Sequence, residues 1–518
     1  MKRWLSTVCG LVLWAAPAAA QRRAPSPPRF DAVETTIARV HAAMRAHRLT
    51  AHQIVQAYLD RIAAYDHAGP NLNALIVVNP RALAVADSLD AIYARTGSFV
   101  GPLHGIPVIV KDNYDTSDLP TTVGCRCLHG AVPPRDATMV AKVRAAGGIV
   151  LAKSNMAEFA FSPYETIGSE LPGYTFNPYA LNRVPAGSSG GTAASVAANL
   201  GEVGLGTDTG NSIRGPPSHD ALVGIRPTIG LTSRAGIAPL YLERDVGGPM
   251  ARTVADAAAV LDVLAGADDS RDTATARAAG HIPPSYTAFL RRDALKGARI
   301  GVARNISNRP GADAEVLQRF QDALGALRRA GATVVDSVNM SFMDSIQVGV
   351  CHGFRHDIEA YLAERPEAPV HTVPEILASK KYHPSIQPRL DAAMADTMSG
   401  QPARCAEVSR NRARFKEALH QVFAQNRLDA IAYPTWSDPP RLVGDLTTPA
   451  GDNSQTPAPA AGFPAITVPM GYTRGVLPAG LQLLGDAWTE GKLIGLAYAY
   501  EQATKHRHPP AAFPALSR

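Results

Sequence analysis

Two serine-bearing loops and one lysine have the types and spacing needed to cleave a carbonyl bond. Residues 187–191 read Gly-Ser-Ser-Gly-Gly, and residues 206–214 read Gly-Thr-Asp-Thr-Gly-Asn-Ser-Ile-Arg. A serine hydroxyl is a poor nucleophile unless a nearby base removes its proton. Lys111 ends an apolar run and can be that base if burial keeps its amine uncharged. The chemistry requires Lys111, Ser188 and Ser212 to lie in one site.

The chain between the two loops predicts one helix and one strand. Residues 192–200 are rich in Ala and have good helix propensity, and Gly201 is a typical residue to end that helix. Residues 202–206 are a short extended run that leads into a second tight loop, residues 207–212. Because the helix and the returning strand are of comparable length, the two serines can meet.

The second loop also offers donors for a negative charge. The backbone N–H groups of Thr209, Gly210, Asn211 and Ser212 are consecutive, and a turn can gather such groups into an anion-binding nest. Attack on an amide carbonyl creates an oxyanion, which donors of this kind stabilise. We therefore expect these four amides to form an oxyanion hole.

The pKa of Lys111 decides whether it can act as a base. Near neutral pH it must fall from about 10.4 to about 7 or 8, a shift that desolvated lysines are known to reach. The alternative is a structural lysine bound to backbone carbonyls at the end of a strand, and its position alone favours that alternative.

Six segments closely resemble the amidase signature family, and together they cover nearly the whole mature chain. The resemblance implies an α/β fold with a large mixed β-sheet core covered by helices on both faces. It also implies hydrolysis of a carboxylic amide through an acyl-serine intermediate, without a cofactor or metal. The C-terminal half most resembles bacterial peptide amidases. The segments are residues 101–113, 186–191, 206–214, 223–230, 248–254 and 461–471.

The resemblance assigns a role to each reacting residue. It implies that Ser212 is the nucleophile, that Ser188 is a bridging serine commonly preceded by a cis peptide, and that Lys111 is the terminal base. Neutral Lys111 would take a proton from Ser188 while Ser188 takes one from Ser212. The same relay would return the proton to the leaving nitrogen, as general-acid catalysis of amide cleavage requires.

Other positions near the serines are expected to support or reshape the site. Asp208 and Arg214 match the family and, with Ser189, are expected to hold the serine loops. Asn211 stands where family members usually have Gly, so the turn can require a positive backbone dihedral, which Asn tolerates, and its side chain can narrow the pocket. His219 is expected to be a structural or rim residue and not a second base.

The N-terminus indicates export. Residues 1–20 have a positive start, an apolar middle and small residues before Gln21, a pattern typical of a signal peptide. The apolar middle is short for a membrane span, so we expect no stable membrane insertion after signal removal. A Pro-rich segment occupies residues 21–30. Residues 31–518 are expected to form a single amidase domain, and the periplasm and secretion both remain open.

Composition limits the partners. A formal net charge of +6 is small for 518 residues, and no basic run of five or more residues occurs, so nucleic acid is not an expected partner. The expected substrate is a small-molecule or peptide amide with a hydrophobic or aromatic part. The oligomeric state stays open. Several aromatic or apolar side chains precede the serine loops, and they could line the substrate pocket or equally pack in the core. They are Met156, Phe159, Phe161, Tyr164, Tyr174 and Phe176.

Four cysteines remain after signal removal. One residue separates Cys125 from Cys127, so a disulfide between them is expected to be strained and a zinc site there lacks partners. A bridge between Cys351 and Cys405 is possible in an exported protein, and the sequence does not decide it.

Strands and helices alternate along the rest of the chain, as in a largely parallel or mixed sheet. The Pro-rich segments 364–374 and 433–460 are expected to be surface loops. Strands are expected at 74–78, 108–110, 149–152, 299–303, 333–335, 429–432, 465–468 and 481–484. Helices are expected twice within 31–68 and at 80–93, 137–146, 314–330 and 492–504, and a mostly helical region is expected from about 343 to 425.

Two other functions compete with an amidase. The run at 187–191 fits the G-x-S-x-G elbow of an esterase with Ser189 as nucleophile, but residues 181–186 do not resemble the apolar strand that an elbow needs. A catalytically silent exported protein that binds amides is the second alternative. The intact set of lysine and two serines favours an enzyme.

Overall fold

One mixed β-sheet runs through the described part of the chain, which in this computed structural model is Met1 and residues 30–516. The expected signal peptide at 1–20 and Pro-rich segment at 21–30 therefore lie almost wholly outside the described residues. The strand order is β1-β3-β2-β4-β6-β5-β10-β11-β9-β7-β8. The strands are β1 Leu75–Val78, β2 Pro107–Lys111, β3 Ile149–Ser154, β4 Val203–Asp208, β5 Val223–Arg226, β6 Val246–Ala251, β7 Arg299–Val302, β8 Thr333–Asp336, β9 Ala430–Pro434, β10 Ala465–Thr473 and β11 Leu477–Leu484.

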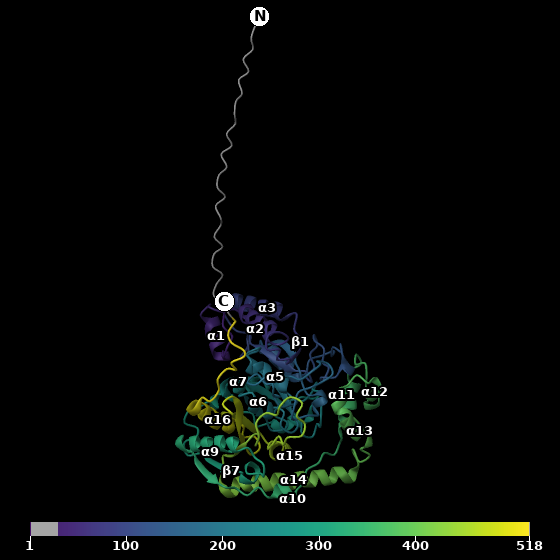
Figure 1. Cartoon of the computed structure of the whole chain (residues 1–518), viewed down its shortest axis with the longest axis vertical. Coiled ribbons are helices and arrows are strands. Elements are labelled where there is room, and N and C mark those ends of the chain that lie inside the picture. The colour runs from purple at the N-terminus through teal and green to yellow at the C-terminus, as the bar shows by residue number, and fades with distance from the viewer. Residues whose placement is uncertain (2–29, 517–518) are drawn as a thin grey trace.

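Helices surround this sheet (Figure 1). Helices α1 to α3 lie at one end of the molecule and α14 at the other, while α5 and α6 lie near its centre. The helices are α1 Ile37–Arg45, α2 Ala51–Tyr65, α3 Ala82–Thr96, α4 Thr138–Ala145, α5 Gly190–Ala197, α6 Gly215–His219, α7 Val254–Leu264, α8 Arg304–Ser307, α9 Ala314–Arg329, α10 Phe342–Ser345, α11 Phe354–Ala363, α12 Val373–Ser379, α13 Gln387–Ala395, α14 Pro402–Asn426, α15 Pro457–Ala461 and α16 Glu490–Thr504.

Both faces of the sheet are covered, as the side chains of β10 show. Successive residues of a strand point to opposite faces. Ile466 and Val468 belong to the main hydrophobic core, on the face where α9 and α16 pack. Thr467 points the other way, beside Gly480, where a Cβ would come within 2.5 Å of Ser218 Oγ on α6. The expected α/β fold with a large mixed sheet between helices is confirmed.

The sheet topology brings the expected functional segments together. Strands β2 and β4 are parallel neighbours, so their carboxyl ends lie at the same edge of the sheet. β2 ends at Lys111 and β4 ends at Asp208. Helix α5, which follows the first serine loop, packs against both strands. The lysine and the two serine loops therefore meet at one edge.

Most expected elements are present, but strands β5 and β6 and helices α6, α7, α8 and α15 were not predicted. β6 reads Val-Gly-Gly-Pro-Met-Ala, and Gly with Pro usually indicates a loop. Its Gly248 is required by packing, because a Cβ there would lie 2.3 Å from Ile225 O of β5.

The segment 433–460 is a surface loop only in part, which corrects the expectation. Trp436 is 2% exposed and Ser454 is fully buried, and α15 at the end of the segment is buried as well. The segment 364–374 also includes a buried residue, Arg365, which is 2% exposed. Both segments contribute polar groups to the interior because neighbouring backbone atoms satisfy their hydrogen bonds.

The cysteines form two pairs. Cys125 is bonded to Cys127, a pairing that the sequence left open, and their Cα atoms are 5.1 Å apart. Cys351 is bonded to Cys405. The second bond joins the start of α14 to the segment before α11.

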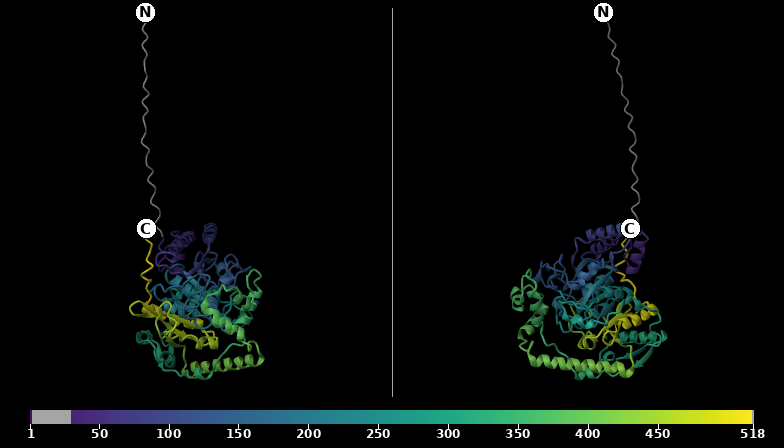
Figure 2. Two further views of the ribbon diagram at one scale, coloured as in Figure 1. Left: turned by 45° about the vertical axis from the view of Figure 1, so that its right-hand side comes forward. Right: turned by 180° about the vertical axis from the view of Figure 1, so that it is seen from behind.

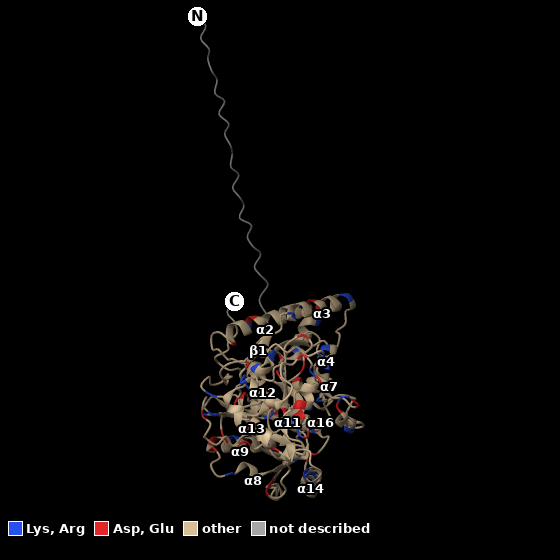
Figure 3. Cartoon of the chain, turned by 90° about the vertical axis from the view of Figure 1, so that its right-hand side faces the viewer, with Lys and Arg blue, Asp and Glu red and all other residues tan. Residues whose placement is uncertain are grey.

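The helical segment 342–426 forms one side and one end of the molecule, away from α1 to α3 (Figure 2). Acidic and basic residues are scattered among each other on the side shown in Figure 3, which agrees with the small net charge. Within the described residues, no helix combines the length and apolar character that a membrane span requires.

Candidate active site

Three polar side chains form a short chain of contacts at the edge where β2 and β4 end. Lys111 Nζ lies 2.8 Å from Ser188 Oγ, and a hydrogen bond of 3.1 Å joins Ser188 Oγ to Ser212 Oγ. Lys111 and Ser188 are fully buried, whereas Ser212 is 6% exposed. The structure therefore brings together the three residues expected to react, with Ser212 nearest to solvent.

The first serine loop is held in a fixed position. The peptide bond between Gly187 and Ser188 is cis, as the resemblance implied. Ser188 O accepts a hydrogen bond from Ala157 N at 3.0 Å, and Gly187 N donates to Pro163 O at 2.9 Å. A Cβ at Gly187 would lie 2.3 Å from Glu165 O, so this position has room for glycine alone. The segment 157–165 thus clamps the loop.

Small residues let α5 lie close to the sheet behind this loop. All eight residues of Gly190–Ala197 are buried. A Cβ at Gly191 would lie 2.3 Å from Asn155 O and 2.7 Å from Ala74 O. The Gly and Ala content that predicted a helix therefore also sets how closely Ser188 approaches the end of β2.

Hydroxyl groups surround the amine of Lys111. Besides Ser188 Oγ, its Nζ contacts Thr207 Oγ1 at 2.8 Å, and Asn113 Nδ2 donates to the same threonine oxygen at 3.1 Å. Burial lowers the pKa of Lys111 to about 7, although the charges of Asp245 and Asp208 act in the opposite direction. At neutral pH a large fraction of this amine is therefore uncharged.

A second buried lysine shows the contrasting, structural arrangement. Lys153 Nζ donates to Thr121 Oγ1 at 2.7 Å and to Pro120 O at 3.0 Å, and it forms an ion pair of 3.2 Å with Asp112. Burial lowers its pKa also, but the carboxylate of Asp112 favours the charged form. The carbonyl-bound lysine considered from the sequence thus exists at Lys153, whereas Lys111 has hydroxyl partners.

A buried ion cluster supports the second serine loop. Asp208 forms ion pairs with Arg214 at 3.0 Å and with Arg226 at 2.7 Å, and all three side chains are fully buried. Asp208 Oδ2 also accepts a hydrogen bond from Ile213 N at 3.1 Å. Burial alone would raise the pKa of Asp208, but the two guanidinium groups bring it below its usual value. Arg214 further donates to Gly210 O.

The four amides expected to bind an oxyanion are free to do so. Among the described residues, none of the N–H groups of Thr209, Gly210, Asn211 and Ser212 donates a hydrogen bond to the protein. The loop is held instead through side chains, since Thr209 Oγ1 donates to Asp245. Burial raises the pKa of Asp245 to about 6.

Asn211 differs from the expectation in two ways. Its backbone does not adopt a positive φ, so Asn is not needed there for its conformational tolerance. Its side chain is also turned toward the protein, because Nδ2 donates to Asp452 Oδ2 at 2.8 Å and Oδ1 accepts from Ser212 Oγ at 3.4 Å. Gln455 donates to the same carboxylate oxygen at 2.8 Å. Asn211 therefore links the second serine loop to residues 452–455.

His219 is buried and packs against Trp436. The two rings stack with centroids 4.7 Å apart, and His219 Nε2 lies 3.4 Å from Asp438 O. Burial lowers the pKa of His219 to about 3, so the ring is neutral throughout the physiological range. These contacts agree with a structural histidine.

Ser189 does not have the geometry of a nucleophile elbow. Its side chain is fully buried, and its Oγ donates to Thr207 O at 3.2 Å. In the described chain, residues 181–186 form isolated bridges and turns but no strand. Ser189 thus ties the two serine loops together.

The aromatic residues before the serine loops separate into groups. Phe159 and Phe161 pack around Phe354 of α11, with ring centroids 5.6 and 4.6 Å from it. Met156 belongs to the same cluster, which Leu240 and Tyr241 border. Tyr164 lies 6.4 Å from Trp436. Tyr174 and Phe176 belong to neither group, since Phe176 N donates to Leu72 O beside β1 and Tyr174 bridges Ile167.

Some residues of the site were not predicted. Thr207 lies within the glycine-rich motif, and a polar residue at the end of a strand beside Lys111 was a usable signal. Asp245, Asp452 and Gln455 come from distant segments that carry no recognisable pattern of their own. Only the folded chain brings them to the loop.

One group of side chains in the described residues has the spacing of metal ligands. Cys351, His352 and Cys405 have ligand atoms within 4.8 Å of one another. Both sulfur atoms form a disulfide, however, so neither is a thiolate.

Comparison with known proteins decides the family. The model of the amidase family matches residues 53–494. The chain belongs to the amidase family. It is a hydrolase that acts on the carbon–nitrogen bonds of linear amides. A solved relative is the native peptide amidase of Stenotrophomonas maltophilia, with 37% identity, a TM-score of 0.83, and coverage of 92% of this chain and 98% of that one.

Two sequence relatives span most of the amidase. A probable amidase of Arabidopsis thaliana is 35% identical over 509 residues, which cover 93% of this chain and 92% of the relative. One component of the glutamyl-tRNA(Gln) amidotransferase of Acinetobacter baumannii is 33% identical over 485 residues, which cover 88% of this chain and 93% of the relative. The relatives thus include both a probable amidase and a subunit of an amidotransferase.

The ion cluster predicts a strong dependence on Asp208. Asp208→Asn is expected to lower the free energy of unfolding by about 3 kcal/mol or more, because a neutral carboxamide leaves two buried guanidinium groups without their counter-charge. Asp322→Asn is the control, since Asp322 and Arg319 form a pair that is 46% and 38% exposed. It should cost less than about 1 kcal/mol. Urea unfolding of both variants measures this, and equal small losses would show that the cluster does not support the fold.

Proposed function

We propose that the amidase cleaves its substrate through an acyl-enzyme on Ser212, with Ser188 and Lys111 as a proton relay. The observation that carries this proposal is the continuous contact from Lys111 Nζ through Ser188 Oγ to Ser212 Oγ, at 2.8 and 3.1 Å. A neutral amine accepts a proton, so the lowered pKa of Lys111 suits it to begin the relay.

The relay works in both directions. Lys111 takes the proton of Ser188 as Ser188 takes that of Ser212, and Ser212 Oγ attacks the amide carbonyl. The proton then returns along the same path to the leaving nitrogen, because an amine anion is a very poor leaving group. Water hydrolyses the acyl ester on Ser212 by the same relay and restores the enzyme.

The loop at 209–212 supplies the oxyanion hole of this mechanism. Its four amides have no acceptor within the described protein, and the side-chain bonds of Thr209 and Asn211 hold the loop from behind. Donors that are fixed before the reaction stabilise a developing charge without reorganisation. This supports a role for the loop in the transition state.

The proposed substrate is an amide with a hydrophobic, aromatic or peptide part. The solved relative with a TM-score of 0.83 is a peptide amidase, and its fold covers 92% of this chain. The aromatic cluster of Phe159, Phe161 and Phe354 is continuous with the segment that clamps Ser188, which favours an apolar group near the reacting carbonyl. A tRNA-bound substrate is disfavoured by the small net charge.

We further propose that the amidase is exported, with cleavage after Ala20. The signal-peptide pattern of residues 1–20 and the two disulfide bonds support this, because disulfides are rare in reducing compartments. Expression of the full chain in a Gram-negative bacterium, followed by N-terminal sequencing of the periplasmic fraction, tests it. A mature protein beginning at Gln21 is expected, and a cytoplasmic protein that retains residues 1–20 would refute export.

The nucleophile is tested with two neighbouring serine variants. Ser212→Ala is expected to reduce kcat on a peptide amide or an anilide by about 10⁴-fold or more. Ser189→Ala should retain most activity, since the Ser189 hydroxyl forms hydrogen bonds with the backbone of Thr207 and with neither Lys111 nor Ser212. The activity of both variants is measured by the release of ammonia from the peptide amide or of aniline from the anilide. The opposite ranking would transfer the role to Ser189, and an inactive parent across amides, anilides and esters would support a silent binding protein.

The pH profile tests the base. kcat/KM for an uncharged substrate is expected to rise about tenfold per pH unit below pH 6 and to level off above a midpoint near pH 7, as Lys111 loses its proton. Measuring kcat/KM between pH 5 and 9 is enough to locate this midpoint. A profile that rises only toward pH 10 would mean that Lys111 stays charged in the resting enzyme.

The pH dependence of protein stability tests the protonation of Lys111 independently of activity. Below pH 7 Lys111 is charged in the folded and unfolded states, and burying the ammonium costs free energy; this cost falls as pH rises from about 7 toward 10.5. Lys111→Met should therefore be inactive but more stable than the parent at pH 6, with a smaller gain at pH 9. Lys153→Met, which leaves Asp112 buried without its cation, should be destabilised at both pH values.

A further inference from the structure

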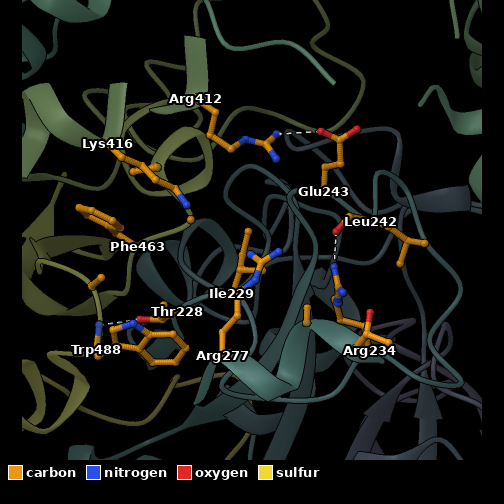
Figure 4. Close-up of a pocket in the computed structure, with 15 residues that line it drawn as sticks. Thr228, Ile229, Arg234, Leu242, Glu243, Arg277, Arg412, Lys416, Phe463 and Trp488 are labelled. Atoms are coloured by element: carbon orange, nitrogen blue, oxygen red, sulfur yellow. Dashed lines mark hydrogen bonds and ion pairs between the residues drawn. The ribbon is translucent and has the colours of Figure 1, made fainter. Parts of the chain in front are cut away.

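A basic hollow of about 490 Å³ lies outside the set of reacting residues. It opens between α14, α15 and the segments around Arg234 and Trp488 (Figure 4), and none of Lys111, Ser188 and Ser212 lines it. A second hollow of about 560 Å³ continues from it toward the Cys351–Cys405 disulfide, and the two share Glu243, Arg277, Arg412 and Lys416. The volume of the basic hollow, about 490 Å³, is within the range of pockets that hold small organic ligands.

Two of the cations in this hollow have no counter-charge. Arg277 and Lys416 form no hydrogen bond or ion pair with any described residue. Figure 4 shows their nitrogen ends directed into the space between α14 and the opposite wall. Burial, and then repulsion from Arg277 and Arg412, lowers the pKa of Lys416. Like charges that face one another around a hollow are unfavourable unless an anion lies between them.

The third cation is only partly satisfied. Arg412 lies one turn before Lys416 on α14 and forms an ion pair of 3.2 Å with Glu243 Oε2. Its Nε is buried and has no hydrogen-bond partner among the described residues. Glu243 has little capacity left for the other cations, because its Oε1 accepts the N–H groups of Cys351 and His352. Arg234, the fourth cation that lines the hollow, is paired with Asp272, so two positive charges of the lining remain without a partner among the described residues.

Aromatic side chains form the opposite wall. Trp488 and Phe463 line the same hollow (Figure 4). Trp488 is fixed in place, since it stacks on His281 with centroids 4.6 Å apart and its backbone N donates to Thr228 Oγ1 at 3.0 Å. A flat apolar surface facing a group of cations suits a ligand with an anionic end and an apolar body.

We propose that this hollow is a binding site for a small organic dianion of the phosphate monoester type. Arg277, Arg412 and Lys416 hold the anionic group, and the organic part lies against Trp488 and Phe463. The dianion neutralises the two cations that lack a partner, and guanidinium groups bind phosphate oxygens through paired hydrogen bonds. The site is separate from the amide-cleaving residues and does not depend on their assignment.

Calorimetric titration of the purified protein with phenyl phosphate tests the proposal, at constant ionic strength adjusted with NaCl. Inorganic phosphate, benzoate and phenol are titrated under the same conditions. Phenyl phosphate should bind at least several-fold more tightly than inorganic phosphate, because only it reaches the aromatic wall, and phenol should not bind. Equal affinity for the two phosphates would refute the role of Trp488 and Phe463. No binding by either phosphate would refute the site.

Variants locate the binding. Arg277→Gln and Lys416→Gln should each weaken phenyl phosphate binding by about tenfold, as loss of a charge-assisted contact predicts. Arg414→Gln is the matched control, because Arg414 is an exposed cation on the same helix that lines neither hollow, and it should bind as the parent does. Ser212→Ala should also bind unchanged, which separates this site from the catalytic one. Equal affinity of all four variants would refute the assignment.

A stability measurement guards against a purely structural role. Without ligand, Lys416→Gln should be at least as stable as the parent, because it removes repulsion within the hollow. The thermal midpoint should then rise with phenyl phosphate in the parent and in Arg414→Gln but much less in Lys416→Gln. A variant that is unstable without ligand, with an undiminished response to phenyl phosphate, would show that Lys416 supports the fold and not the ligand.

Discussion

The lowered pKa of the buried Lys111 amine is the constraint on which the site depends. Burial favours the neutral form, whereas nearby carboxylates favour the ammonium. Asp245 is the stronger of the two opposing charges, and Arg214 and Arg226 both bind the carboxylate of Asp208. The two arginines therefore do more than shape the serine loop, because they also keep a carboxylate close to Lys111 without giving the lysine an ion pair. Lys153 shows the outcome when a carboxylate does approach directly.

The position of these residues at one edge of the sheet explains why few residues are needed to hold the site together. Parallel strands β2 and β4 place Lys111 and Thr207 side by side, and the tightly packed α5 returns Ser188 to them. Each part is fixed by backbone geometry before any substrate arrives. Close backbone contacts require glycine at 187 and 191. The glycines that identify the site in the sequence are therefore also the residues that allow its close packing.

The sequence predicted the parts of this arrangement that are local. Helical and strand periodicity located most elements, and the spacing of the two serine loops around one helix and one strand anticipated their meeting. It did not predict β6, because this strand contains Gly and Pro, which usually indicate a loop. Close packing against β5 requires the glycine at 248. The sequence also misjudged Asn211, whose amide serves as a link to Asp452 and not as a tolerant backbone position. Contacts between distant segments leave no local pattern, so Asp245, Asp452 and Gln455 could not be found in this way.

The segment 240–245 lies between the second serine loop and the basic hollow and contacts both. Asp245 accepts hydrogen bonds from Thr209 on one side, while Glu243 binds Arg412 on the other. Communication between two sites through such a wall needs an element with two arrangements. This segment is instead fixed along its length, since Leu240 N and Tyr241 N bind Asp245, Leu242 N binds Asp357 Oδ2, and Arg226 binds Arg244 O. A wall held at so many points transmits little movement, so the hollow and the serine loops are best understood as two independent sites that share one support.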